Sequence, residues 1–156
     1  MSKSLKRVAK EAEELGLCIQ IIELEIQTKT AADAASAMGC EADQILKSII
    51  FLGKESERCI LFMTAGGNRV DMAKAGKLAG EPLVRADAAI IRAQTGFAIG
   101  GVSPLGYRTE IDKFLDPKLL SFESVWAAAG TPHSMFSIDP NDLVTATHAT
   151  IGDFTQ

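Results

Sequence analysis

A glycine-rich apolar segment between residues 95 and 106, TGFAIGGVSPLG, most constrains how this chain can fold. Gly100 and Gly101 tolerate φ > 0 without a Cβ clash, whereas Pro104 fixes its own φ and pushes Ser103 into an extended conformation. The segment therefore predicts a loop whose bare backbone N–H and C=O groups can approach a ligand closely. A glycine cluster alone also marks an ordinary turn, so a ligand pocket needs a second signal.

Lys47 supplies that second signal, in the segment QILKSIIFL at residues 44–52, which we interpret as a short helical turn leading into a strand. Residues two apart share a face of a strand, so Lys47 is expected to project with Ile49 and Phe51. Two interpretations fit a cation at the mouth of an apolar face. Either an edge lysine extends its amine into water along an apolar stem, or the amine serves a binding pocket.

Helix signals recur along the chain, most of them beside a residue that can cap a helix. Leu5, Val8 and Ala12 recur at helical spacing ahead of Gly16, which is a natural stop. Threonine or aspartate N-caps, and in most cases a closing glycine, bound the others. We predict helices over residues 4–15, 30–39, 71–80, 87–96 and from 139 onward.

Strand signals alternate irregularly with these helices. Ile22, Leu24 and Ile26 alternate with glutamates, which predicts a strand with one face in water. Further strands are expected at residues 48–52, 59–65, 122–129 and 134–138. Hairpin strands mixed with helices predict an α+β fold. We expect a single domain over residues 1–156, with a mixed, mostly antiparallel β-sheet flanked by helices.

Composition narrows the class of protein. The chain has 156 residues, 47% of them hydrophobic, which suits one folded domain. The formal net charge of −4 argues against wrapping a long nucleic acid, although contact with one end of an RNA remains open. The longest apolar runs are far shorter than a bilayer span, and the first residues lack the apolar core of a signal peptide, so we expect no membrane partner and a cytoplasmic location.

Several cofactor and catalytic motifs are missing from the sequence. Cys18, Cys40 and Cys59 form no Cys-x-x-Cys pair, and His133 and His148 have no zinc-ligand spacing. Residues 71–78 contain Gly-Lys but lack the rest of a phosphate-binding P-loop. No Gly-x-Ser-x-Gly elbow or Ser-His-Asp order is present. We therefore expect a mechanism without a metal and without a cofactor.

Three motif blocks resemble those of the YbaK/ProRS-associated domain family. They are ILKSIIF at residues 45–51, Gly100-x-x-x-Pro104, and Glu110-Ile111-Asp112 followed by Leu115, and the similarity runs from about residue 30 to 154. Residues 96–101 and 125–133 are most similar to the free-standing ProX-like branch. The resemblance implies that family's fold and an aminoacyl-tRNA deacylase that edits mischarged tRNA in trans. It also implies an aminoacyl-tRNA partner and association with an aminoacyl-tRNA synthetase.

The resemblance also implies roles for individual residues, most of which have an ordinary structural alternative. Thr30 is also a helix cap, Ser103 a pre-proline turn serine, Asp112 a surface cap and His133 a solvated turn histidine. The carried-over catalytic residues are Lys47, Gly100 and Gly101, and the substrate-binding residues are Thr30, Ser103, Asp112 and His133.

Two positions depart from that branch, which commonly has an aromatic residue in place of Leu105 and a histidine in place of Tyr107. The cognate amino acid therefore stays open among small residues such as alanine and serine. A noncatalytic module that binds an aminoacylated RNA end, a nucleotide or an amino acid is the alternative function. A weaker option uses the first helix, where Lys3, Lys6, Arg7 and Lys10 form either a solvated basic stripe or an RNA or protein contact.

Overall fold

The computed structural model describes residues 2–25 and 28–156. Ile26, expected in a strand, lies outside the described residues. The helices are α1 (Lys3–Glu14), α2 (Ala31–Met38), α3 (Met72–Ala79), α4 (Ala88–Thr95) and α5 (Pro140–Thr147), with short 3-10 turns η1 (Ala42–Gln44) and η2 (Pro117–Ser121). The strands are β1 (Ile21–Glu23), β2 (Leu46–Gly53), β3 (Cys59–Ala65), β4 (Leu83–Arg85), β5 (Asp112–Leu115), β6 (Val125–Ala128), β7 (Ser134–Ile138) and β8 (Thr150–Ile151).

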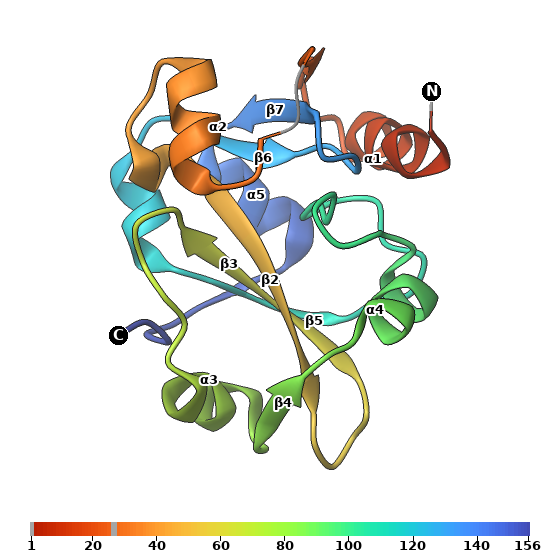
Figure 1. The fold of residues 1–156 in the computed structure, drawn as a ribbon, viewed down its shortest axis with the longest axis vertical. Coiled ribbons are helices and arrows are strands. Elements are labelled where there is room, and N and C mark those ends of the chain that lie inside the picture. Colours follow the sequence, from red (N-terminus) through yellow and green to blue (C-terminus); the bar gives the residue numbers. More distant parts are fainter. Residues whose placement is uncertain (1, 26–27) are drawn as a thin grey trace.

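The strands form two sheets (Figure 1). One has the order β4-β2-β3-β5-β8 and the other the order β1-β7-β6. Among the strand pairs of the described residues, β3–β5 and β5–β8 are parallel and the others antiparallel, which confirms the expected mixed, mostly antiparallel α+β class. An isolated bridge from Ile45 to Trp126 links the two sheets at the entrance of β2. That link places the start of β2 at the junction between the sheets.

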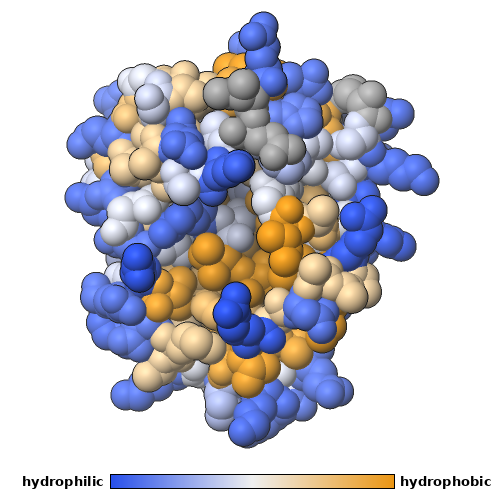
Figure 2. Space-filling model, viewed as in Figure 1, coloured by the Kyte–Doolittle hydropathy of each residue, from blue (hydrophilic) through white to orange (hydrophobic). Residues whose placement is uncertain are grey.

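The largest buried cluster draws residues from both sheets and from three helices. It includes Val8 of α1, Leu61 of β3, Ile91 of α4, Phe136 of β7 and Leu143 of α5. β3 is buried at every position because it lies between β2 and β5. Figure 2 shows that apolar side chains also gather across the middle of one face, between more polar regions. No helix that the structure describes is both long and apolar enough to cross a bilayer.

The predicted N-caps are confirmed. Thr30, Asp71, Asp87 and Asp139 each accept a backbone N–H in the first turn of the following helix. These caps are local hydrogen bonds, so they form wherever the sequence places an oxygen at the right position. The strand predicted at 122–129 is shorter, because residues 117–121 form η2 and the strand begins only at Val125.

Arg7 corrects the prediction of a solvated or RNA-contacting basic stripe on α1. Its Nε donates to the Gly106 carbonyl at 3.0 Å and its Nη2 to the Gly96 carbonyl at 2.6 Å. The guanidinium also lies over the Phe97 ring, 5.3 Å from its centroid. Arg7 therefore ties α1 to both ends of the glycine-rich loop. The remaining lysines of the predicted stripe are exposed.

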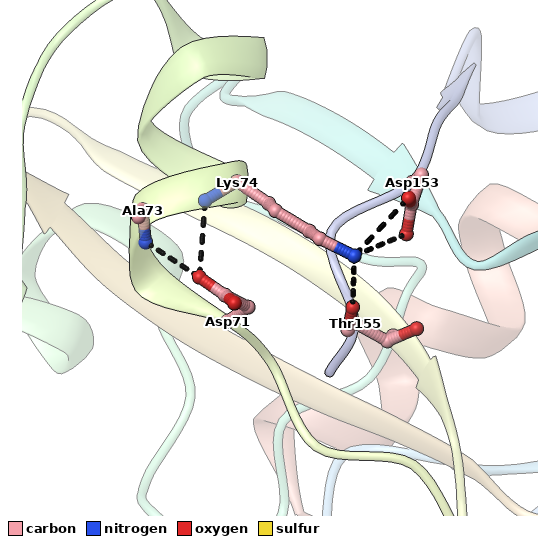
Figure 3. Close-up of polar contacts among 5 residues, drawn as sticks. All are labelled: Asp71, Ala73, Lys74, Asp153 and Thr155. Carbon is pink, nitrogen blue, oxygen red and sulfur yellow. Dashed lines mark hydrogen bonds and ion pairs between the residues drawn. The ribbon is translucent and has the colours of Figure 1, made fainter.

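The C-terminal segment packs beside α3 (Figure 3). Lys74 Nζ lies 3.2 Å from Asp153 Oδ2 and donates to the Thr155 carbonyl at 2.9 Å. Thr155 also pairs with Val70 in an antiparallel bridge. The Gln156 N–H donates to the Arg69 carbonyl at 3.0 Å. The end of the chain therefore braces the loop that precedes α3.

Candidate functional site

A cavity of about 660 Å³ opens where the two sheets meet. The N-terminal part of α2, the first residues of β2, the loop at residues 66–69 and Gly100 line it. The predicted residues Lys47, Gly100 and Thr30 all contribute to its wall. The volume is in the range of ligand sites, and apolar residues such as Ala34 and Met135 supply part of the lining.

Lys47 is the central cation of the cavity. Its side chain is half-buried, and Nζ donates to the Asn68 carbonyl at 2.5 Å. Burial lowers the pKa of Lys47 below its ordinary value, and the nearby Arg69 charge lowers it further, whereas Asp116 and Asp43 act in the opposite direction. The amine has lost part of its hydration and donates a hydrogen bond to one carbonyl. Its other N–H groups can donate to an anionic or polarised ligand in place of water.

Asp116 is a site residue that the sequence analysis missed. Its side chain is 2% exposed, and Oδ2 accepts hydrogen bonds from the Ala65 N–H at 3.1 Å and from Asn68 Nδ2 at 2.8 Å. Oδ1 accepts from the Lys118 N–H at 2.9 Å. The carboxylate therefore fixes the side chain of Asn68, and the backbone carbonyl of the same residue accepts from Lys47. The only local signal was an aspartate before a proline after a buried strand.

Asp112, which the sequence analysis placed in the pocket, does not line it. It is exposed at the start of β5, where it stands opposite Ile60. The buried carboxylate behind the cavity belongs to Asp116, four positions further along the chain. The turn at the end of β5 brings Asp116 to the loop after β3, because these two strands run parallel. Asp112 instead stands at the opposite end of β5.

Three predicted site residues belong to the glycine-rich loop, and only one of them, Gly100, lines the cavity. Gly100 lines the cavity with φ +92°. Gly101 does not line it, since a Cβ at that position would lie 3.0 Å from the Gly130 carbonyl oxygen and from Thr131 Cα. Ser103 is fully buried, and its Oγ accepts from the Leu105 N–H at 3.3 Å. Gly101 and Ser103 thus shape the loop behind the cavity wall.

Of the remaining predicted positions, Thr30 lines the cavity and His133 does not. Thr30 both caps α2 and lines the cavity, so its two interpretations are compatible. His133 is exposed in the turn between β6 and β7 and does not line the cavity. Leu105 is fully buried, and the hydroxyl of Tyr107 is buried with no hydrogen-bond partner among the described residues. Neither departure from the family pattern therefore lies in the cavity wall.

Ser48 and Arg69 also line the cavity and were not predicted. The Ser48 hydroxyl is buried and has no partner in the described part of the chain. Within residues 2–25 and 28–156, no group of three or more His, Cys, Asp or Glu side chains could hold a metal ion. The polar groups that line this site are the ammonium groups of Lys47 and Lys29, the Arg69 guanidinium, the Asn68 amide, hydroxyls and backbone groups.

These features define an α+β domain with a cavity at the junction of its two sheets and a half-buried lysine in the cavity wall. The chain belongs to the aminoacyl-tRNA editing domain family, whose sequence profile matches residues 25–146. It is an aminoacyl-tRNA deacylase, an enzyme that hydrolyses the ester between an amino acid and tRNA.

Two known relatives match most of this chain. YwhH, an uncharacterised protein of Bacillus subtilis (strain 168), is 31% identical over 123 residues, which are 79% of this chain and 78% of YwhH. EbsC of Enterococcus faecalis (strain ATCC 700802 / V583), named as a candidate Cys-tRNA(Pro)/Cys-tRNA(Cys) deacylase, is 21% identical over 81% of this chain and 77% of its own.

Solved structures show the same fold. A crystal structure described as a candidate trans-editing enzyme for prolyl tRNA synthetase has a TM-score of 0.93 and 41% identity, and the match covers 100% of this chain and 99% of that one. The hypothetical protein APE2540 has a TM-score of 0.89 and 27% identity, with 96% and 99% covered. These matches confirm the expected fold and family.

Proposed function

We propose that this enzyme edits in trans, removing a small, wrongly attached amino acid from tRNA(Pro) in the cytoplasm and serving a prolyl-tRNA synthetase. The solved relative at 41% identity, described as a candidate trans-editing enzyme for that synthetase, supports this choice over the whole chain. The observation that carries the proposal is Lys47, whose half-desolvated ammonium stands in the wall of a cavity of suitable size.

The proposed chemistry is attack of water on the ester carbon. The new C–O bond forms first and turns the carbonyl oxygen into an oxyanion. The bond from that carbon to the ribose oxygen then breaks, which releases a free amino acid and a ribose hydroxyl. The neighbouring ribose hydroxyl of the substrate assists transfer of the proton from water to the leaving oxygen. An aminoacyl ester is already activated, so the protein chiefly has to position it and stabilise the developing oxyanion, without a metal.

Different residues of the cavity would bind the substrate, position it and limit the size of its amino acid. Lys47 would hold the terminal phosphate or the ester region, as a compact charge with three donors. The backbone at Gly100 would lie against the terminal adenosine, because no side chain separates it from the cavity. Apolar residues such as Ala34 and Met135 would limit the size of the amino acid, a discrimination worth about 1–3 kcal/mol per methylene.

A deacylation screen tests the proposal. tRNA(Pro) charged with alanine, serine, cysteine or proline is mixed with excess enzyme, and the rate of ester loss is measured with and without a strong chelator. Rapid loss of one or more small non-cognate amino acids, unaffected by the chelator, is expected. Binding of the charged tRNA without turnover would instead identify a noncatalytic module, and activity lost to the chelator and restored by zinc would overturn the metal-free mechanism.

A further inference from the structure

Three arginines from separate parts of the chain converge at the C-terminal end of α4. Arg7 belongs to α1, Arg92 to the last turn of α4, and Arg108 follows the glycine-rich loop. Arg7 Nη2 and Arg108 Cδ both lie 2.5 Å from the point that a Cβ on Gly96 would occupy. Both arginine side chains therefore pack against the open face of Gly96, where a Cβ would displace them.

The cluster has an unbalanced positive charge. None of the ion pairs among the described residues involves Arg7, Arg92 or Arg108. Arg7 is engaged by backbone carbonyls, but no hydrogen bond of the Arg92 or Arg108 side chain is found in the described part of the chain, and both residues are exposed. Burial lowers the pKa of Arg7, and repulsion from Arg108 and Arg92 lowers it further. Like charges held together without a carboxylate are typical of a site for an anion.

The cluster is continuous with the candidate site through the glycine-rich loop. Arg7 donates hydrogen bonds to the Gly96 and Gly106 carbonyls of the loop. Gly100, which lies between these two residues in the sequence, lines the cavity. Gly100 lies four positions after Gly96, which limits the distance between them to about 14 Å. Figure 1 shows α1, α4 and this loop on the same side of the molecule. A polyanion whose end enters the cavity can therefore pass over the arginines.

We propose that Arg92 and Arg108, supported by Arg7, bind backbone phosphates of the tRNA acceptor stem, an inference that rests on the proposed function. Guanidinium groups match phosphate oxygens in a bidentate geometry, which suits them to this contact better than lysines. The chain carries a net charge of −4, so RNA binding needs a local positive surface of this kind. Arg7 faces the loop and so leaves the predicted stripe on α1, whose lysines stay exposed.

The test uses the double variant Arg92→Gln/Arg108→Gln, which leaves the loop contacts of Arg7 intact. Binding of deacylated tRNA(Pro) is titrated between 50 and about 200 mM salt, a range over which phosphate contacts lose affinity steeply. Two lost contacts should weaken binding at least about tenfold at low salt and flatten the log K against log salt slope by about 1.4–1.8. The control, Lys54→Gln/Lys77→Gln, removes the same charge from exposed positions outside the cluster and should leave the slope near wild type.

Single-turnover deacylation separates this proposal from the proposed function. The double variant should be slowed on full-length aminoacyl-tRNA at subsaturating enzyme and unchanged on an aminoacylated CCA trinucleotide, which has no stem. A wild-type enzyme inactive on both substrates would remove the proposed function, yet the titration would still report on the arginines. An unchanged salt slope in the double variant, or equal slopes in it and the lysine control, would overturn the phosphate-binding surface.

Discussion

Replacing Asp116 with alanine should destabilise the protein and displace Lys47. The substitution removes an acceptor that receives three N–H groups, and hydrogen bonds to a charged acceptor are each worth about 1.5–3 kcal/mol. Only the contact with the Ala65 N–H is fully buried, so water can partly replace the partners of Asn68 and Lys118. We therefore expect the free energy of unfolding to fall by about 3–5 kcal/mol.

Asp116→Asn provides the matched comparison. Its amide oxygen can take the place of Oδ2 and keep the Ala65 and Asn68 contacts, which leaves its NH₂ facing the Lys118 N–H. The loss of stability should be about 1–2 kcal/mol, because the opposed donors lie in a partly exposed position. Urea denaturation followed by circular dichroism measures both variants on one scale.

Deacylation rates then show whether Asp116 acts through Lys47. Asp116→Asn keeps the fold but removes a charge that raises the pKa of Lys47, so the alkaline limb of the single-turnover rate should move to lower pH. A purely structural aspartate would leave that limb in place. If Asp116→Ala costs less than about 1 kcal/mol, the carboxylate does not hold the loop and the reasoning from its three hydrogen bonds is wrong.

Three further predictions concern the cavity wall. Lys47→Ala should keep the fold and slow deacylation about 100-fold in single-turnover assays, and Lys47→Arg should not restore the rate, because a planar fork cannot replace a compact ammonium; a near wild-type rate would make Lys47 a simple edge lysine. Gly100→Ala meets only Pro132 Cγ at 3.8 Å, so its expected rate loss of about tenfold comes from strain at φ +92°. Gly80→Ala, strained at φ +83° in open space, should lower the melting temperature similarly but leave the rate unchanged. Arg69→Gln should shift the alkaline limb to higher pH, after subtraction of spontaneous ester hydrolysis, because the Arg69 charge lowers the pKa of Lys47; an unshifted limb would show that the two cations do not interact.

Local chemistry explains which parts of the fold the sequence predicted well. Helix caps such as Thr30 and Asp71 depend on atoms within three residues, so their partners were visible in the sequence. β4, β5 and β8 span only two to four residues, which is too short for a period-two pattern. β5 exists because it pairs with β3 across a long crossover, and only the folded chain shows that pairing.

The same distinction applies to the site. Local sequence and the family resemblance together pointed to Lys47 and Gly100, and both line one cavity. Asp116 contacts Asn68, which lies 48 positions away in the chain, so the link between them could not be read from spacing. Asp112 was carried over from the family motif, and its exposure became visible only in the folded chain, where Asp116 is the buried aspartate. Arg7 was placed in a stripe that was either solvated or a contact for RNA or protein, because helical periodicity says nothing of the loop that Arg7 contacts.

The bracing of the loop by the chain terminus has a mechanical consequence. Tension applied at Gln156, by a surface tether or a fused partner, would load the hydrogen bond to Arg69 first and then the bridge from Thr155 to Val70. Lys74 anchors the same segment to α3 through Asp153 and Thr155. Force would therefore reach the Asn68 and Arg69 side of the cavity before it reached either sheet. A tether at the first residues would instead pull on α1 and, through Arg7, on the glycine-rich loop.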